Sequence, residues 1–330
     1  MLTTTRAVGC SGRGLVFCLA VVLLGAPALA ASPRLVLISL DGCRADAVTP
    51  DVAPNLTTLE AAGAHAREAL DDLPPVTTTN HATLLTGLTA SEHHIVIDAD
   101  LPGVVPFKTL FDYAHDAGLR CAFFAGKVKL RYFAPPEALE TIDIDSDQAA
   151  LLERVLVQLA PDGPDVIFVH FHDPDSTGHR SGWMSPEYLA AVMQVDAYVG
   201  QIAGALAADA GRGSYLIVTA DHGGEGPTHI LNDAATREIP WIVTGPGIPA
   251  GAELTDTVAI ADTTPTALWL LGLDVPAGLS GRVRSDVKGT PAADLEPLPV
   301  APLGPPCAIF VLPVMLGLMW AARRQRGLRK

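Results

Sequence analysis

The stretch Arg34–Gly42, which reads RLVLISLDG, decides how the rest of the sequence is interpreted. Its first seven residues form a run of strand length that is apolar except for Arg34 and Ser39, and Asp41-Gly42 follows at once. A short, continuous apolar run bounded by turn residues is typical of a strand buried on both faces of a parallel sheet. Four further runs of this kind occur along the chain: Cys121–Ala125, Asp165–Phe171, Tyr215–Thr219 and Pro240–Thr244.

Segments of helical period lie between and beyond these runs. The last of them follows Asp262, a residue type that caps helices, and has Pro265 in its first turn. Alternating strands and helices predict βαβ units. We therefore expect an α/β fold over residues 31–287, with a doubly wound, mostly parallel central sheet flanked by helices. The predicted helices are Leu110–Ala117, Gln148–Leu159, Pro186–Ala208 and Thr264–Leu271.

The first 30 residues have the features of a secretory signal peptide. Arg6 and Arg13 precede the apolar run Gly14–Leu24, and Ala28-Leu29-Ala30 supplies the small residues of a cleavage site. We expect cleavage rather than an uncleaved anchor, because the apolar run is short for a membrane span. The protein is therefore expected to be exported, to the periplasm or the cell surface.

The C-terminal part of the chain has a different composition. Residues 288–306 are rich in proline and lack a period, which is typical of a linker. In residues 307–330, sixteen uncharged residues (Cys307–Ala322) precede a block of five basic ones. This order favours a membrane anchor with a cytoplasmic tail, although the run is of marginal length and contains Pro313. The alternatives are a processed sorting tag and, more weakly, a buried helix.

Without its two ends the chain is strongly acidic. Residues 31–306 hold 15 Lys and Arg against 36 Asp and Glu, a formal charge of −21. Such a surface repels nucleic acid and anionic lipid, so we expect no nucleic acid polymer as a partner. Only Cys43 and Cys121 lie in this part of the chain. Export permits a disulfide between them, but the sequence leaves their pairing open, as it does the oligomeric state.

Polar residues follow three of the predicted strands directly. Asp41 follows the first, the segment His172–His179 follows the strand that ends at Phe171, and Asp221-His222 comes just after Thr219, with His229 close behind. Ligands gather at the carboxyl ends of strands in doubly wound sheets. Carboxylate and imidazole together suit zinc and related divalent ions. A single Asp-His pair is explained as well by a cap or a surface loop, but the conjunction predicts a metal centre.

A nucleophile is predicted in the stretch that starts at Pro74. A proline-rich turn there precedes a segment of helical character, which places Thr77 at a helix N-terminus. Free backbone N–H groups at such a position favour an anion. Alone, a threonine before a helix is only a capping signal. Beside a metal centre its hydroxyl can act as a nucleophile, because coordination lowers its pKa.

As an ordered set, six motifs resemble the nucleotide pyrophosphatase/phosphodiesterase branch of the alkaline phosphatase superfamily. The resemblance runs from Arg34 to about Val283. The motifs are LDGCRAD (40–46), APNLTTLEAAGA (53–64), TTTNHATLLTG (77–87), DPDSTGH (173–179), TADHGG (219–224) and IPWIVTGPGI (239–248).

The resemblance implies two metal ions, expected to be zinc, and a role for each matching residue. Thr77 is chosen over its threonine neighbours because the family's nucleophile stands three residues before an Asn, here Asn80. It would attack phosphorus in line, and water would then release the phosphorylated threonine. The implied ligands are Asp41, Asp221, His222 and the Thr77 hydroxyl for one ion, and Asp175, His179 and His229 for the other.

The implied substrate is a small phosphodiester or a nucleotide pyrophosphate, and two further residues are candidates for contacting it. Asp98 stands nearest the place where the family has an Asn that donates to the phosphoryl group. An ionised carboxylate would repel that group, so either Asp98 is protonated or another donor acts. Lys127 lies in a stretch similar to the lysine loop of related sulfatases, although a solvated basic loop explains it equally. His81, His170 and His172 are expected to support the site rather than bind metal.

Four other functions fit less well. A phosphomonoesterase would share the metal centre and is the nearest rival. A sulfatase would need a Cys-x-Pro-x-Arg type context, which the sequence lacks. Phosphomutases with the same core are generally cytosolic, which the signal peptide opposes. A catalytically silent binding protein is opposed by the intact ligand set and by Thr77.

Overall fold

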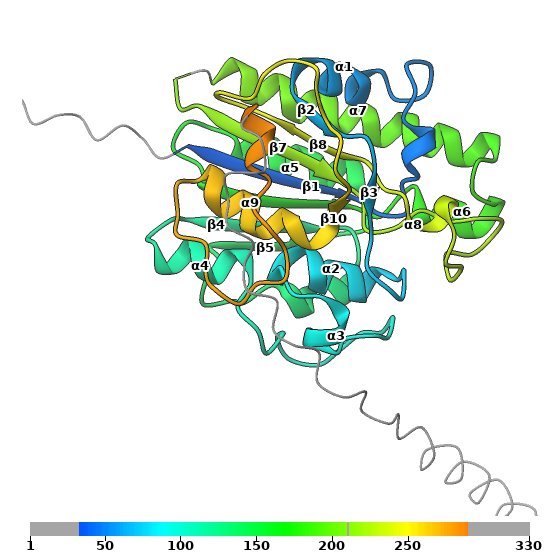
Figure 1. Ribbon diagram of the computed structural model, residues 1–330, viewed down its shortest axis with the longest axis horizontal. Coiled ribbons are helices and arrows are strands. Elements are labelled where there is room, and N and C mark those ends of the chain that lie inside the picture. The colour runs from blue at the N-terminus through cyan, green and yellow to red at the C-terminus, as the bar shows by residue number, and fades with distance from the viewer. Residues whose placement is uncertain (1–32, 210, 290–330) are drawn as a thin grey trace, which may run out of the picture.

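The computed structural model describes residues 33–209 and 211–289. The predicted signal peptide, nearly all of the predicted linker and the C-terminal segment 307–330 lie outside the described residues. Within them, an eight-stranded sheet forms the centre of the protein, in the order β5-β4-β6-β1-β7-β8-β2-β9 (Figure 1).

The five strands predicted from apolar runs all lie in this sheet. Only β8 among the eight is antiparallel to its neighbours, β7 and β2. The predicted α/β fold with a mostly parallel sheet is therefore confirmed. These strands are β1 (Arg34–Leu40), β4 (Cys121–Ala125), β6 (Val166–Phe171), β7 (Ser214–Thr219) and β8 (Trp241–Thr244).

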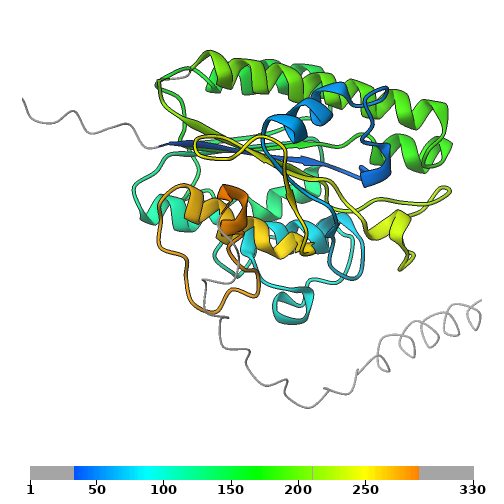
Figure 2. The same cartoon turned by 45° about the horizontal axis from the view of Figure 1, so that its top comes forward.

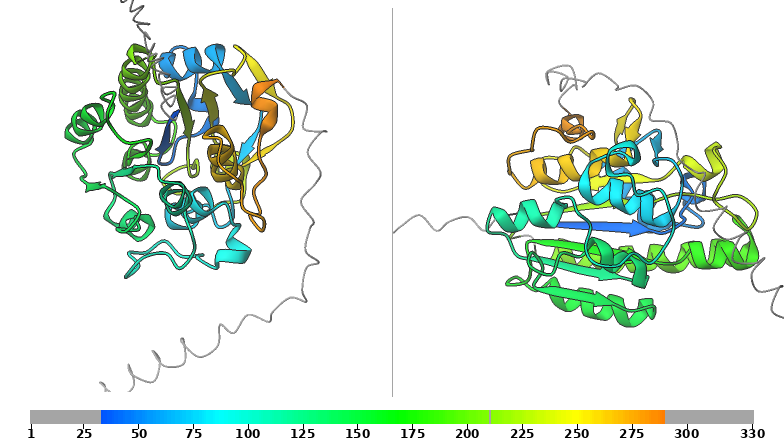
Figure 3. Two further views of the ribbon diagram at one scale, coloured as in Figure 1. Left: turned by 90° about the vertical axis from the view of Figure 1, so that its left-hand side faces the viewer. Right: turned by 90° about the horizontal axis from the view of Figure 1, so that it is seen from below.

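Helices cover both faces of the sheet (Figures 1 and 2). The end-on view in Figure 3 shows the sheet between the two layers of helices. Four of these helices were predicted, and their observed ends lie within one residue of the predicted ones. One layer holds α1 (Pro54–Ala62), α5 (Gln148–Gln158) and α7 (Pro186–Ala208), and the other holds α2 (Thr77–Thr86), α4 (Leu110–Asp116) and α9 (Thr263–Leu270).

Several short elements have no counterpart in the sequence prediction. They are two to seven residues long, which is too short for a period to show. The strands are β2 (Ala64–Ala66), β3 (Ala69–Leu70), β5 (Thr141–Ile144), β9 (Ala252–Leu254) and β10 (Val258–Ala259). The helices are α3 (Ala90–His93), α6 (Asp175–Ser181) and α8 (Ala234–Arg237), with 3₁₀ turns η1 (Ala45–Ala47), η2 (Val128–Phe133), η3 (Ile260–Asp262) and η4 (Ser285–Lys288).

Asp262 is the N-cap residue of α9, as predicted, but its side chain does not cap the helix. Its carboxylate accepts hydrogen bonds from the backbone N–H groups of Ala259 (3.2 Å) and Arg282 (2.9 Å) and from none in α9. The reason is that η3 runs directly into α9, which leaves Asp262 in a helical conformation (φ −67°, ψ −14°). A capping side chain needs extended backbone to reach the first free N–H groups.

Among the described residues, α7 is the one helix whose length and composition would suit a membrane span. It packs instead as a layer of the fold. Val192, Val195 and Val199, spaced three or four residues apart, are buried in the core. Asp196, on the same side, accepts hydrogen bonds from the backbone N–H groups of Asn55 (3.1 Å) and Leu56 (2.8 Å) at the start of α1.

Candidate metal centre and active site

The carboxyl ends of β1, β6 and β7 lie level with one another. Leu40 pairs with Phe171 and Ser39 pairs with Thr219, so the residues that follow each strand meet at one edge of the sheet. This edge lies at the end of the molecule where Figure 1 places α6 and α8.

Hydrogen bonds donated by backbone N–H groups tie the three loops together at this edge. Asp175 N–H donates to the Asp41 carbonyl (2.8 Å), and Gly42 N–H donates to Asp221 Oδ1 (3.0 Å). Gly42 has a φ of +72°, and a Cβ there would lie only 2.8 Å from Asp175 Cα. Glycine at this position therefore allows the loops after β1 and β6 to approach each other closely.

Three carboxylates are buried where these loops meet. Asp41, Asp175 and Asp221 are all less than 5% exposed. Four buried polar atoms of the cluster have no hydrogen-bond partner among the described residues: Asp41 Oδ1, Asp175 Oδ1, Asp221 Oδ2 and His222 Nε2. Unpaired charges are costly to bury, so this donor set fits bound cations.

The three candidate histidine ligands share one orientation. Each Nδ1 lies within hydrogen-bond distance of a backbone carbonyl oxygen, which can only accept, so each Nδ1 carries the proton. In the neutral ring the lone pair of each Nε2 is available to bind a metal, and metal-binding histidines almost always have such a partner for their other nitrogen. The pairs are His222 with Gly223 O (2.8 Å), His229 with Pro75 O (2.7 Å) and His179 with Pro227 O (3.0 Å).

The ligand atoms form two overlapping groups. Asp41, Asp221 and His222 form one, as the resemblance implied. The other joins Asp175 and His229 with His222 rather than with the expected His179. His179 Nε2 nevertheless lies 3.3 Å from Asp175 Oδ1, on a half-exposed side chain at the edge of the cluster.

Thr77 is the first residue of α2 and is buried. Its hydroxyl oxygen lies 3.5 Å from Lys127 Nζ, and the same ammonium group contacts Asp41 Oδ2 (2.7 Å) and Asp175 Oδ2 (2.6 Å). Lys127 thus joins one carboxylate from each group to the hydroxyl of Thr77. It enters from the loop after β4, a fourth strand whose carboxyl end reaches this edge.

The charges of these groups depend on one another. Burial acts to lower the pKa of Lys127, but Asp41 and Asp175 raise it above its ordinary value, so the side chain is an ammonium ion. Burial acts to raise the pKa of Asp41, yet Lys127 and a hydrogen bond from His170 hold it well below its usual range. Burial and the charge of Asp41 raise the pKa of Asp221 to about 6. The negative charge here therefore exceeds what Lys127 neutralises.

Asp98 was expected either to be protonated, and so able to donate to the phosphoryl group, or to be replaced in this role by another donor. The structure excludes the protonated form. Both of its oxygens accept from Lys129 Nζ (2.7 and 2.8 Å), and Oδ1 also accepts from the Thr78 hydroxyl (3.0 Å). Burial acts to raise the pKa of Asp98, but Lys129 and Thr78 lower it below its ordinary value. The side chain is a paired carboxylate, and the N–H donor that contacts Thr77 is Lys127.

Two of the predicted supporting histidines, His170 and His81, lie behind the cluster and contact it, whereas the third, His172, contacts Ser176 and the Ser146 carbonyl. His170 accepts from Gly126 N–H at Nδ1 (3.2 Å), so its Nε2 donates to Asp41 Oδ2 (2.8 Å). Burial lowers the pKa of His170 to about 4, so the ring is neutral. His81 donates to the Thr77 carbonyl (2.8 Å) and lies against Ser39 (3.0 Å).

Sequence reasoning missed Trp183, which contacts all of the ligand loops. Its Nε1 donates to Gly42 O (2.9 Å), and its backbone N–H donates to Gly226 O (2.7 Å). A Cβ added at Gly178 or Gly224 would overlap the indole. The ring centroids of His179 and His229 lie 5.1 and 5.9 Å from that of Trp183. The glycines beside the ligands could have indicated a large side chain packed against these loops, since a glycine often marks a place of close approach.

Replacing Trp183 with leucine is expected to weaken zinc binding by roughly 10- to 100-fold, the usual effect of removing a group that orients metal ligands. Calorimetric titration of the metal-free protein would measure this. Trp269→Leu on α9 is the matched control and should bind zinc like the wild type. Equal affinity in Trp183→Leu, at an equal melting temperature, would contradict the positioning role.

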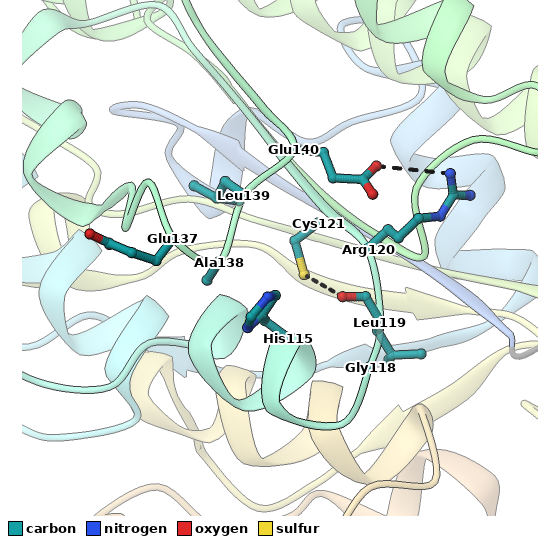
Figure 4. A pocket seen from close by; sticks show the side chains of 9 residues that line it. All are labelled: His115, Gly118, Leu119, Arg120, Cys121, Glu137, Ala138, Leu139 and Glu140. Carbon is teal, nitrogen blue, oxygen red and sulfur yellow. Dashed lines mark hydrogen bonds and ion pairs between the residues drawn. The ribbon is translucent and has the colours of Figure 1, made fainter.

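A separate cavity of about 270 Å³ lies at the amino ends of β4 and β5, away from the ligand cluster (Figure 4). Arg120 and Glu140 on its wall form an ion pair at 3.8 Å. Cys121 also lines it, and both Cys121 and Cys43 are free, buried thiols. Burial raises the pKa of each thiol to about 12, so neither is a reactive thiolate.

The model of one protein family, type I phosphodiesterase / nucleotide pyrophosphatase, matches residues 35–102 and 98–238. The matched stretches include every candidate ligand from Asp41 to His229. The chain belongs to this family. The resemblance on which the ligand assignment was based is therefore confirmed at the level of the family.

Curated proteins similar to this type I phosphodiesterase family member include 2,3-bisphosphoglycerate-independent phosphoglycerate mutases. That of Rhodopirellula baltica is 33% identical over 157 residues, which are 44% of this chain and 27% of the mutase. That of Cereibacter sphaeroides is 34% identical over 161 residues, 46% of this chain and 30% of the mutase. The aligned part thus spans less than a third of the length of these relatives.

Solved structures of similar fold come from several branches of the superfamily. The phosphonate monoester hydrolase of Agrobacterium radiobacter has a TM-score of 0.63 at 16% identity, covering 80% of this chain and 79% of that one. Human ectonucleotide pyrophosphatase/phosphodiesterase 5 has a TM-score of 0.60 at 14% identity, covering 74% and 96%. At these identities the likeness establishes the alkaline phosphatase-like fold.

Proposed function

We propose that this protein is a metal-dependent phosphohydrolase that cleaves phosphodiester or nucleotide pyrophosphate bonds through Thr77. The observation that carries the proposal is the orientation of three histidines. His179, His222 and His229 each donate Nδ1–H to a backbone carbonyl and direct Nε2 toward buried carboxylates. A surface loop or a cap does not require this arrangement, whereas a metal site does.

The donor set of carboxylates and imidazoles suits two zinc ions. Asp41, Asp221 and His222 would hold one of them, with the Thr77 hydroxyl beside it. Asp175 and His229 would hold the other, together with His179, and His222 lies close to both. Bound divalent ions would supply positive charge at the phosphoryl group and lower the pKa of a hydroxyl or a water.

We propose that the reaction proceeds in two steps. The Thr77 oxygen attacks phosphorus, the bond from phosphorus to the departing ester oxygen breaks, and the Thr77 proton is lost to water. Water next attacks phosphorus and the bond to Thr77 breaks, which frees the threonine hydroxyl and the phosphate product. The Lys127 ammonium group, 3.5 Å from the attacking oxygen, stabilises the developing negative charge.

The relatives agree with this chemistry. Murine ectonucleotide pyrophosphatase/phosphodiesterase 5 was solved in complex with AMP as an inactive threonine-to-alanine variant. We infer a small-molecule phosphoester substrate and no nucleic acid polymer for the present chain. We also infer export by the N-terminal segment and a C-terminal membrane anchor, both predicted from the sequence.

A comparison of three esters in wild type and Thr77→Ala tests the proposed function. The esters are bis-p-nitrophenyl phosphate, p-nitrophenyl phosphate and the p-nitrophenyl ester of thymidine monophosphate. We expect faster hydrolysis of the diesters, zinc dependence, and loss of activity in the variant. A zinc-loaded wild-type protein that hydrolyses none of the three at any pH would contradict the proposal and favour a silent binding protein.

One observation favours a phosphomonoesterase as the second candidate. Lys127 adds a fixed positive charge to a centre that would also hold two divalent ions. A phosphate monoester carries two negative charges near neutral pH and a diester carries one, so the added charge stabilises the monoester more.

Lys127→Gln is therefore expected to lower kcat/KM for p-nitrophenyl phosphate by roughly 100-fold, the effect of losing one donor to a transition-state oxyanion. The loss for the diester should be several-fold smaller, because the diester carries one negative charge fewer than the monoester. Lys108→Gln, whose exposed ammonium group pairs with Asp116, is the matched control. Equal losses for the two esters, with zinc content unchanged, would argue against a charge-specific role.

A further inference from the structure

Asp98 joins the two segments that carry the nucleophile and Lys127. Its Oδ1 accepts a hydrogen bond from the hydroxyl of Thr78 (3.0 Å), the residue after Thr77 in α2. Both of its oxygens accept from Lys129 Nζ (2.7 and 2.8 Å), and Lys129 follows Lys127 by two positions. The Asp98–Lys129 ion pair is therefore held beside the reaction centre through both segments.

The charge of Asp98 acts on the reaction centre from a distance. Burial acts to raise the pKa of Asp98, but Lys129 and Thr78 lower it below its ordinary value. The charge of Lys127 lowers the pKa of Asp98 further, so these two groups are close enough to act on each other. Lys127 Nζ in turn lies 3.5 Å from the Thr77 hydroxyl oxygen. A carboxylate at Asp98 therefore also acts on a phosphoryl group at Thr77, and it needs no contact with that group to do so.

Asp98 determines the net charge of this part of the site. Among the described residues it is the one ion-pair partner of Lys129. Lys127, in contrast, is paired with carboxylates of the ligand cluster. The Asp98–Lys129 pair adds no net charge, whereas Lys129 without that carboxylate would add a positive one. Because 35% of the Asp98 side chain and 19% of the Lys129 side chain are exposed, solvent screens these charges only in part.

The esters that this site is proposed to hydrolyse differ in charge at the phosphoryl group. Near neutral pH a phosphate monoester carries two negative charges there and a diester carries one. An additional positive charge nearby stabilises the monoester more than the diester, and loss of that charge reduces the difference. Enzymes commonly achieve specificity in this way, with a charge that disfavours the wrong substrate.

Resting on the proposed function, we infer that Asp98 is a specificity-determining residue that favours phosphodiesters. Its carboxylate cancels the charge of Lys129 and so removes the added attraction for a doubly charged monoester. The preferred substrate then carries a single negative charge at the phosphorus that Thr77 attacks. Lys127 favours the monoester, so Asp98 and Lys127 act in opposite directions on the same choice.

Asp98→Asn provides the first arm of the test, with zinc-loaded protein. Asparagine has nearly the same shape and keeps an oxygen that accepts from Thr78, but it has no charge. The measured quantity is kcat/KM for p-nitrophenyl phosphate divided by kcat/KM for bis-p-nitrophenyl phosphate. This ratio should rise by roughly tenfold, the effect of one partly screened charge on a substrate with one more negative charge.

Lys129→Gln provides the second arm and should change the same ratio in the opposite direction, to roughly a tenth of the wild-type value. This variant removes the positive charge and leaves Asp98 ionised. The double variant Asp98→Asn, Lys129→Gln should return close to the wild-type ratio, because neither charge remains. A role in folding alone would impair both single variants in the same way, so opposite signs identify an effect of charge.

Asp116→Asn is the matched control, because Asp116 also pairs with a lysine, Lys108, and both side chains are exposed. It should keep the wild-type ratio. The inference would be overturned by an unchanged ratio in Asp98→Asn, or by shifts of the same sign in Asp98→Asn and Lys129→Gln, at equal zinc content and melting temperature. Either result would leave the proposed function intact.

Failure of the proposed function can be recognised separately. If zinc-loaded wild type hydrolyses neither ester, calorimetry compares the binding of phenylphosphonate, a dianion, with that of its monomethyl ester, a monoanion. Asp98→Asn should then raise the affinity for the dianion relative to the monoanion by roughly tenfold. An unchanged ratio of affinities, or no binding of either anion, would overturn the inference as well.

Discussion

Thr77→Ala is expected to lower kcat/KM for the preferred phosphoester by about a thousandfold or more, since loss of a nucleophile removes the covalent route. Thr77 is buried at the first position of α2, and its hydroxyl lies 3.5 Å from the ammonium group that joins Asp41 and Asp175. The measurement is steady-state hydrolysis with zinc content determined in parallel. Thr77→Ser should retain part of the activity, because it keeps an oxygen at the same position.

Thr79→Ala is the matched control for this substitution. Thr79 is in the same turn of α2, it is buried, and its hydroxyl has no hydrogen-bond partner among the described residues. Its replacement should leave kcat/KM within a few-fold of the wild type. A large loss in Thr79→Ala with little loss in Thr77→Ala would show that the neighbouring threonine is the nucleophile.

His222→Ala is expected to weaken both metal sites at once, whereas His179→Ala should weaken only one. His222 belongs to both groups of ligand atoms, and its ring stacks on that of His229 with centroids 3.9 Å apart. Losing a ligand exceeds the 10- to 100-fold effect of losing a supporting group, so we expect a loss of more than about 100-fold in zinc affinity. The measurement is the number of zinc ions that remain bound after gel filtration.

His172→Ala is the control for this pair. Its ring contacts the Ser176 hydroxyl and the Ser146 carbonyl rather than the carboxylate cluster. The variant should keep the zinc content of the wild type. If His222→Ala retained both ions at wild-type affinity, His222 would not be shared between the sites.

The elements that the sequence predicted correctly are those whose pattern is long enough to read. RLVLISL at 34–40 is apolar except for Arg34 and Ser39 because both faces of β1 are covered, and the observed strand has the predicted ends. The Pro186–Ala208 helix is likewise observed with its predicted ends. Strands such as β3 and β10 have two residues each, and their pairing comes from contacts far apart in the chain. No local pattern could reveal them.

The site shows the same division. The sequence predicted that three aspartates would meet, because they follow parallel strands whose carboxyl ends share an edge of the sheet. They are Asp41, Asp175 and Asp221. The contact of Lys127 with both Asp41 and Asp175 did not follow, since it depends on the position of β4 beside β6 and on the path of the loop after it. The role of Trp183 was even harder to predict from the sequence, because it depends on contacts with glycines in three separate loops.

The sequence by itself determined the α/β fold, the family and the residue types gathered at one edge of the sheet. These follow from local apolar periodicity and from which residue stands next to which strand. Only the tertiary structure decided how the groups are shared: His222 between two ligand sets, Lys127 between two carboxylates, and Asp98 with Lys129. The reason is that charge and hydrogen bonding depend on distances of a few ångströms between side chains, and packing from distant segments sets those distances.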